Sequence, residues 1–275
     1  MPAESERSHQ INTLRDLEKL PLNDVRSRIR ANAYSGHTAG LAAGYQQCNV
    51  VILPAADALD FFRYCQRNPK PCPLIYVSDT GDPSMRELGR DIDIRTDVPL
   101  YNVYRGGHLI EQRPEISKLW RRDFVTFALG CSFTFEHALV SAGIPMRHIE
   151  YDRTVSVFRT SIETTPAGRF SGDLVVSMRP VKKTDLETIT RTCARFPHAH
   201  GPPIHQGNPA EIGVMDITRP DWGDAVEIRA GEVPVFWACG VTPQNALMNA
   251  KPEMCITHTP GCMLLTGLDA EPGHH

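Results

Sequence analysis

The sequence lacks the features of membrane, exported and nucleic-acid-binding proteins. None of its apolar runs approaches the roughly 20 residues that span a bilayer. Residues 1–7 are polar and acidic, without the apolar core of a signal peptide or the acid-poor character of a transit peptide. The formal net charge of −3 over 275 residues indicates no basic surface for nucleic acids or anionic lipids. We therefore expect a cytoplasmic globular protein without nucleic-acid or membrane partners.

Motifs for metals and organic cofactors are also missing. The chain has no Cys-x-x-Cys pair, no His-Glu-x-x-His, no Walker loop and no Gly-x-Gly-x-x-Gly after a strand. Its eight scattered cysteines are typical of reduced thiols inside a cell. We expect no cofactor. The alternative is a bound metal. Its candidate ligands are His200 and His205, which lie close together in the sequence, and the later His258.

What the sequence does contain is a repeated motif. Cys131-Ser-Phe-Thr-Phe-Glu-His-Ala-Leu139 and Cys239-Gly-Val-Thr-Pro-Gln-Asn-Ala-Leu247 both fit Cys-x-x-Thr-x-x-x-Ala-Leu. Each copy follows an apolar run and precedes a helix-like stretch. A strand, a turn and a helix start present free backbone N–H groups to an anion. The structural alternative is that the threonines are N-caps and the cysteines small buried residues.

The order of predicted elements favours an α/β fold with layered architecture. We expect a main α/β domain, residues 1–145 and 230–275, that contains the repeated strand-turn-helix unit. A smaller α+β module, residues 146–229, is inserted in it. The elements that support this division are strands at 49–54, 74–77, 153–160, 173–179, 225–229, 233–238, 254–258 and 263–266, helices at 55–67, 116–129 (where a strand is the alternative) and 184–195, a surface excursion at 78–99 and a hairpin at 100–111.

Several further motifs resemble one protein family over residues 30–266. They are Thr38-Ala-Gly-Leu-Ala42, Gly130-Cys-Ser-Phe-Thr-Phe-Glu136, Val176-Ser-Met-Arg-Pro180, Arg195-Phe-Pro197 and Val235-Phe-Trp-Ala-Cys-Gly-Val-Thr-Pro-Gln244. The family is that of the hydro-lyase-like proteins that include the D-glutamate cyclases of animal mitochondria. The resemblance implies a two-module α/β protein and, for some members, conversion of D-glutamate to 5-oxo-D-proline with loss of water. Ala43 and Cys262 depart from the pattern, which has proline and histidine there.

Lactam formation from glutamate needs an acid and a base, an oxyanion site and a group that binds the α-carboxylate. Arginine suits a carboxylate because it binds with two parallel hydrogen bonds. A thiol at a helix start can have a lowered pKa and act as a nucleophile. The predicted catalytic residues are Cys131, Glu136, His200, His205 and Cys239. The predicted substrate-binding residues are Ser132, Thr134, Arg159, Arg179, Gly240 and Thr242.

The sequence leaves other functions open. One alternative is another hydro-lyase, or an amide hydrolase, that acts on a small acid through the same helix starts. Another is a protein that binds an amino acid without turning it over. In each case the expected partner is a small amino acid or lactam, with a homodimer as an open option.

Overall fold

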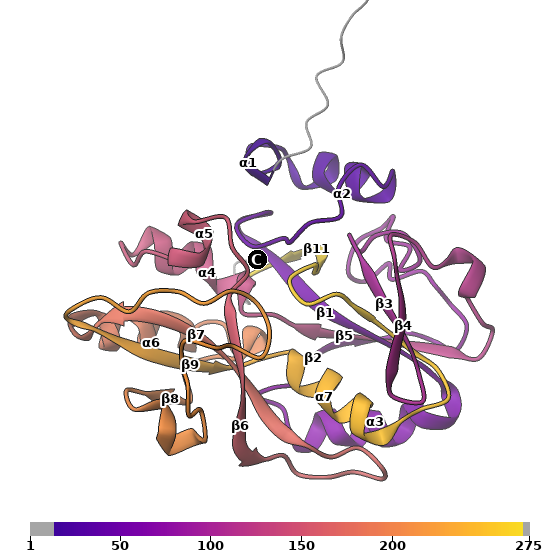
Figure 1. Ribbon diagram of the computed structural model, residues 1–275. Helices are drawn as coiled ribbons and strands as arrows, with labels where there is room; N and C mark the ends of the chain where they lie inside the picture. The colour runs from indigo at the N-terminus through magenta and orange to yellow at the C-terminus, as the bar shows by residue number, and fades with distance from the viewer. Residues whose placement is uncertain (1–13, 272–275) are drawn as a thin grey trace, which may run out of the picture.

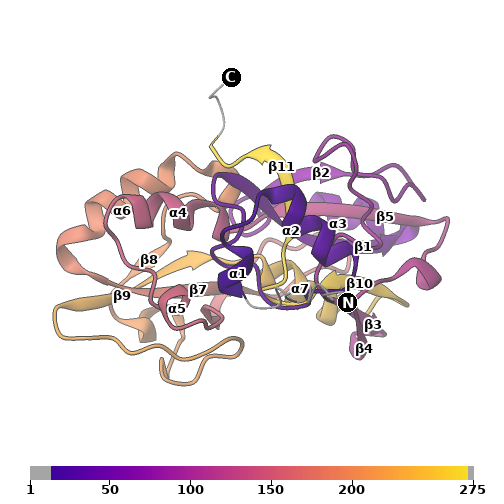
Figure 2. The ribbon, with the colours of Figure 1, turned by 90° about the horizontal axis from the view of Figure 1, so that it is seen from above.

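A computed structural model describes residues 14–271, which form two sheets lying side by side (Figures 1 and 2). The seven-stranded sheet has the order β2 (Leu74–Val77), β5 (Phe124–Gly130), β1 (Tyr45–Pro54), β10 (Cys255–His258), β3 (Tyr101–Arg105) and β4 (His108–Arg113), with β11 (Leu264–Asp269) also paired to β1. The four-stranded sheet has the order β6 (Ser156–Glu163), β7 (Asp173–Lys182), β9 (Glu232–Ala238) and β8 (His205–Gln206). Every strand pairing is antiparallel.

Helices cover both sheets, so the predicted α/β class with a repeated strand-turn-helix unit is confirmed. The α-helices are α1 (Leu14–Leu17), α2 (Leu22–Arg30), α3 (Ala55–Arg67), α4 (Phe133–Ser141), α5 (Arg147–Glu150), α6 (Leu186–Ala194) and α7 (Val241–Ala250). Short 3-10 turns are η1 (Ser117–Leu119), η2 (Lys183–Asp185), η3 (Pro197–Ala199) and η4 (Pro209–Ile212). Within the described residues, no helix is both long and apolar enough to cross a membrane.

The large sheet is buried on both faces, as the alternation along β1 indicates. Val50 and Ile52 face one apolar cluster, which the segment 85–98 covers. Val51 and Leu53 face the opposite cluster, which α3 and α7 cover. The prediction that residues 78–99 run over the surface is therefore wrong in part, because their apolar side chains close one face of the sheet.

In each repeated unit, the strand belongs to one sheet and the helix that follows packs against the other sheet. Strand β5 belongs to the large sheet, but α4 after it packs Phe135 and Leu139 against the small sheet. Strand β9 belongs to the small sheet, but α7 after it packs Ala246 and Leu247 against the large sheet. In Figure 1, α4 accordingly lies near α6, whereas α7 lies beside α3. The two helix starts thus meet where the sheets adjoin.

Most of the predicted elements are confirmed, and two are not. Of the two alternatives over 116–129, the helix is wrong and the strand is right, since 124–130 is a central strand, β5, paired to both β1 and β2. The strand predicted over 225–229 is irregular chain in the structure. The pairing of β9 with β7 also places the strand at 233–238 in the small sheet, not with the main sheet as we predicted. The division into domains at 145 and 229 otherwise stays a prediction.

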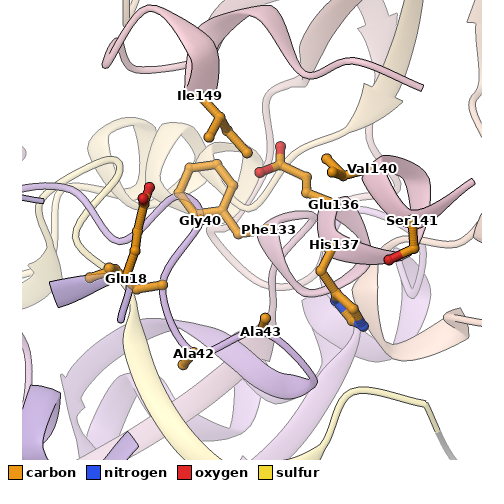
Figure 3. A pocket seen from close by; sticks show the side chains of 11 residues that line it. Glu18, Gly40, Ala42, Ala43, Phe133, Glu136, His137, Val140, Ser141 and Ile149 are labelled. Carbon is orange, nitrogen blue, oxygen red and sulfur yellow. The ribbon is translucent and has the colours of Figure 1, made fainter. Parts of the chain in front are cut away.

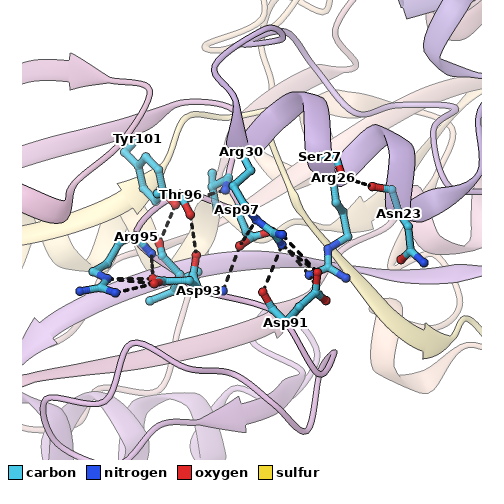
Figure 4. Close-up of polar contacts among 12 residues, drawn as sticks. Asn23, Arg26, Ser27, Arg30, Asp91, Asp93, Arg95, Thr96, Asp97 and Tyr101 are labelled. Carbon is cyan, nitrogen blue, oxygen red and sulfur yellow. Dashed lines mark hydrogen bonds and ion pairs between the residues drawn. The ribbon is translucent and has the colours of Figure 1, made fainter.

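Helix α2 is fixed to the segment 91–97 by a network of arginines and aspartates (Figure 4). Arg30 donates to the carboxylates of Asp97, at 2.6 Å, and of Asp91, at 3.2 Å. Arg26 lies 2.8 Å from Asp91, and its own side chain is buried. Asp97 is buried too, and it also accepts the backbone N–H of Asp93. The network orders the segment that closes one face of the large sheet.

Candidate active site

The two repeated turns make the same pair of hydrogen bonds to a neighbouring strand. In the first turn, the Thr134 hydroxyl accepts the backbone N–H of Gln47 at 3.0 Å, and the N–H of Cys131 donates to the Gln47 carbonyl. In the second, the Thr242 hydroxyl accepts the N–H of Val175 at 3.0 Å, and the N–H of Cys239 donates to the Val175 carbonyl. These hydrogen bonds fix each turn against the backbone of that strand.

This pattern changes the interpretation of both threonines. Their hydroxyls are buried and bonded to strand backbone, and neither caps its helix with a side-chain hydrogen bond. Neither threonine lines the cavity described next. The structure therefore places Thr134 and Thr242 in a structural position and does not bring them into the substrate site that we predicted.

Both turns open on one small cavity of about 30 Å³, between the two sheets. The first turn contributes Cys131, Ser132 and Phe133, and the second contributes Cys239 and Val241. The other lining residues are Asn49 and His258 from the large sheet, Val157 from β6, and Thr154, Val155, Trp222, Gly223, Pro260, Gly261 and Met263 from connecting segments. Both copies of the motif therefore line a single cavity.

The two thiols in this cavity are neutral. Burial raises the pKa of Cys131 to about 12, although the N–H of Phe133 at the helix start acts in the opposite direction. Burial likewise raises the pKa of Cys239 to about 11, against the N–H of Val241 and the charge of Arg179. The lowered pKa that we expected for a thiol at a helix start is not found, because desolvation outweighs the helix N–H groups.

Asn49 lies between the two turns. Its side-chain amide donates to the carbonyl of Gly130, just before the first turn, at 2.8 Å. At the second turn, a Cβ atom added to Gly240 would lie 2.1 Å from Nδ2 of Asn49. Gly240 has an ordinary helical φ of −66°, so the position requires glycine for lack of space. The predicted binding residue Gly240 thus acts by admitting Asn49.

Replacing Gly240 with alanine is expected to displace Asn49 from the cavity. We expect a loss of about 1–3 kcal/mol in the free energy of unfolding, from overpacking and the broken hydrogen bond, measured by urea denaturation. Gly267→Ala is the matched control, since a Cβ there would lie 3.5 Å from its nearest neighbour. If the two variants were equally stable, the close approach of Asn49 would not be the reason for glycine at 240.

His258 also lines the cavity, although the sequence analysis named it only as a candidate metal ligand and not as a catalytic residue. Its Nδ1 lies 3.1 Å from the backbone nitrogen of Val50, and Gln244 lies beside the ring. Nδ1 also lies 3.3 Å from the Val50 carbonyl, and the Gln244 amide nitrogen is 3.3 Å from both ring nitrogens, so the contacts fit either neutral tautomer. Burial lowers the pKa of His258 to about 4. The ring is therefore a neutral group able to exchange a proton.

The buried cluster behind the first turn positions Ser132. Arg179 donates through Nε to Glu136 at 2.9 Å, through Nη1 to Ser177 at 3.0 Å and through Nη2 to the Ser132 hydroxyl at 3.0 Å. His148 Nε2 lies 3.0 Å from the same Glu136 oxygen. Burial alone would raise the pKa of Glu136, but the charges of His148 and Arg179 lower it to about 2. Arg179 is thus held by protein groups and reaches the cavity only through Ser132.

The remaining predicted residues lie elsewhere. Arg159 is exposed on β6, with its guanidinium 5.6 Å from the centre of the Trp222 ring. His205, on the edge strand β8, donates through Nε2 to the Asn208 carbonyl at 2.8 Å. His200 is buried against the Lys70 carbonyl at 2.8 Å and does not line the cavity. Among residues 14–271, no three His, Cys, Asp or Glu side chains gather as metal ligands, so the three candidate histidines are not brought together.

The two buried histidines predict loss of stability in acid. Burial lowers the pKa of His200 and of His258 to about 4, from an ordinary 6.5. Between these values the unfolded chain binds protons that the folded chain does not. The free energy of unfolding is therefore expected to have its highest value above pH 6.5 and to fall toward pH 4, by up to about 3 kcal/mol per histidine.

Urea denaturation at pH 7, 5.5 and 4 measures this dependence. His200→Gln is expected to flatten it, whereas His108→Gln, at an exposed position on β4, is the control. An unchanged slope in His200→Gln would contradict the assignment.

Sequence reasoning missed the cavity residues that lie outside the two turns, above all Asn49, Trp222 and His258 as a non-metal group. Asn49 is part of a short motif, Gln47-x-Asn49, that the chain shares with the family it resembles, and this motif could have marked Asn49 as a candidate site residue. The departure at Cys262 does not remove a cavity group, because this thiol faces the Ser35 carbonyl at 3.8 Å and is absent from the lining.

Comparisons with known proteins identify the family of the chain. Residues 125–267 match the family model described as D-glutamate cyclase. A protein of Cupriavidus taiwanensis named "Putative hydro-lyase" is 57% identical over 245 residues, covering 89% of this chain and 92% of that protein. One of the same name from Dinoroseobacter shibae is 55% identical over 264 residues, covering 95% of this chain and 88% of that protein.

Among solved structures, a nitrogen repressor-like protein from Methanococcus jannaschii gives a TM-score of 0.37 at 9% identity, covering 83% of this chain and 90% of that one, too low to support an argument. The family match spans about half of the chain, including both repeated turns, and the relatives align with nearly all of it. The chain belongs to the D-glutamate cyclase family.

Proposed function

We propose that this protein is a hydro-lyase that converts D-glutamate to 5-oxo-D-proline and water. The observation that carries the proposal is the single cavity at which both repeated helix starts meet, in a chain of the D-glutamate cyclase family. Relatives named as hydro-lyases support the general class of reaction. The substrate is the part of the proposal that needs an experiment, and a cytoplasmic location remains part of the same proposal.

The reaction makes one bond and breaks one. The amine nitrogen attacks the carbon of the side-chain carboxyl group, a C–N bond forms, and a carboxyl oxygen leaves as water. The nitrogen loses its protons as the leaving oxygen gains them, so no oxidant or reductant is needed. The site must move protons and stabilise a tetrahedral oxyanion.

The residues around the cavity can meet these needs. The backbone N–H groups of Phe133 and Val241, at the starts of α4 and α7, interact with the thiols of Cys131 and Cys239. Those of Thr134, Phe135 and Thr242 donate to carbonyls of the two turns, so Phe133 and Val241 carry the preference of the helix starts for an anion. The Ser132 hydroxyl accepts from Arg179 and is left free to donate. His258 is the group that exchanges protons. The neutral thiols of Cys131 and Cys239 act as walls of the cavity and weak donors, and a thioester route is disfavoured by their raised pKa values.

Substrate must enlarge the cavity to enter. A volume of about 30 Å³ holds one or two water molecules, well short of glutamate. Trp222 and Gly223 lie in a segment without regular structure, and Gly261 follows β10 in a turn. We expect these segments to shift when substrate binds, which would exclude water as the site closes again.

The test is an assay of the purified chain with D-glutamate, L-glutamate and both 5-oxoproline enantiomers, followed by chiral chromatography. The expected result is interconversion of D-glutamate and 5-oxo-D-proline only. Saturable binding without turnover would replace the proposal with an amino-acid-binding protein. Neither binding nor turnover of any of the four compounds would overturn the assignment to glutamate.

A further inference from the structure

A second cavity, of about 280 Å³, lies along α4 (Figure 3). Helix α4 provides one wall, and the segment 40–43 with Glu18 provides the opposite one. Phe133 lines this cavity as well as the candidate active site. Its lining residues are Glu18, Gly40, Leu41, Ala42, Ala43, Phe133, Glu136, His137, Val140, Ser141 and Ile149.

A buried carboxylate oxygen faces this cavity without a partner. Glu136 is 1% exposed, and its Oε1 takes both Arg179 and His148. Its Oε2 is buried and has no hydrogen-bond partner. Figure 3 shows the carboxylate directed into the space between Ile149 and Val140. An ionised carboxylate only accepts hydrogen bonds, so the missing partner is a donor.

Two further side chains around the cavity, Glu18 and His137, offer acceptors. Glu18 brings a second carboxylate, which faces the cavity from the opposite wall (Figure 3). His137 donates through Nδ1 to the Thr134 carbonyl at 2.8 Å, so Nε2 of the neutral ring is an acceptor. No lysine or arginine is among the described lining residues. The remaining walls are mainly apolar, and Val140 is 51% exposed there.

We propose that this cavity binds a small primary ammonium compound with a short apolar chain. The ammonium group donates to Oε2 of Glu136 and to the carboxylate of Glu18, while the chain packs on Phe133, Val140 and Ile149. Arg179 and His148 already interact with Glu136 through the other oxygen, so the charge of the ammonium group is met mainly by Glu18. A carboxylate-bearing ligand such as glutamate does not suit this cavity, because no cationic side chain lines it.

The probe is n-butylammonium chloride, titrated into the full chain by isothermal calorimetry. The expected result is saturable binding at one site, with no binding of butyrate and weaker binding of n-butanol. Glu18→Gln should weaken n-butylammonium binding about tenfold, the worth of one partly screened charged hydrogen bond. Val140→Phe should fill the cavity and abolish binding. Glu187→Gln, at an exposed position on α6, is the matched control and should leave binding unchanged.

This binding is separable from the proposed function, because it requires no turnover. Trp222→Ala changes only the candidate active site and should leave n-butylammonium binding intact while altering the D-glutamate reaction. Circular dichroism establishes that each variant is folded. The proposal is overturned if the parent chain shows no saturable binding, or if Glu18→Gln and Val140→Phe bind the probe as tightly as the parent.

Discussion

Replacing Arg179 with methionine is expected to destabilise the folded chain by about 3–5 kcal/mol. Arg179 and Glu136 are both 1% exposed, and the substitution would leave the Glu136 carboxylate buried without its main partner. The Ser132 and Ser177 hydroxyls would each lose a donor as well. Removing one member of a buried ion pair costs more than the pair contributes, because the remaining charge stays desolvated. Urea denaturation at pH 7 measures the change in free energy.

Two further variants identify the cause. Arg159→Met removes the exposed arginine of the neighbouring strand and should cost less than about 1 kcal/mol, since it loses only a surface contact with Trp222. The double variant Arg179→Met with Glu136→Leu should recover part of the loss, because no buried charge is left unpaired. If Arg179→Met were as stable as the parent, the buried pair would not hold the first turn in place.

Replacing His258 with glutamine is expected to lower kcat by about 10²–10⁴-fold for the proposed substrate. Glutamine can still accept the N–H of Val50, which keeps the local structure, but it cannot exchange a proton with a substrate. The assay is the conversion of D-glutamate to 5-oxo-D-proline, with kcat and KM measured separately. KM should change little, because the imidazole acts on the reaction and not on the anchoring of carboxylates.

His205→Gln is the matched control for this variant. His205 was predicted as catalytic from the sequence, but it lies on the edge strand β8, outside the cavity. Its replacement should leave kcat unchanged. A value for His258→Gln within threefold of the parent would remove His258 from the reaction and leave the helix N–H groups and Ser132 to carry it.

Most helices and strands were predicted correctly because the residues that specify them lie within a few positions of one another in the sequence. In the predicted helix 55–67, Phe61, Tyr64 and Cys65 recur at the three- and four-residue spacing of one helix face, and the structure buries them on α3. Residues 124–130 were harder, since a central strand buried on both faces has no alternation to distinguish it from a helix. Residues 225–229 alternate like a strand, but no neighbouring strand pairs with them, and a strand exists only with a partner.

The candidate site was only partly predictable for the same reason. Cys131, Ser132 and Cys239 were found because the repeated motif marks both turns, and these residues line the cavity. Arg159 and Arg179 are both on strands of one sheet, and sequence alone treats them alike. The fold exposes Arg159 and buries Arg179 against Glu136. Their environments come from packing between elements far apart in the chain, which no local pattern contains.

The sequence by itself determined that the chain has two strand-turn-helix units, that they are related, and to which family they belong. Only the tertiary structure decided that the two turns form one site. Each unit starts in one sheet and passes its helix to the other, so the two helix starts are brought together from residues 108 positions apart. Tertiary packing also reversed the expected chemistry of the thiols, because burial raises their pKa by more than the helix N–H groups lower it.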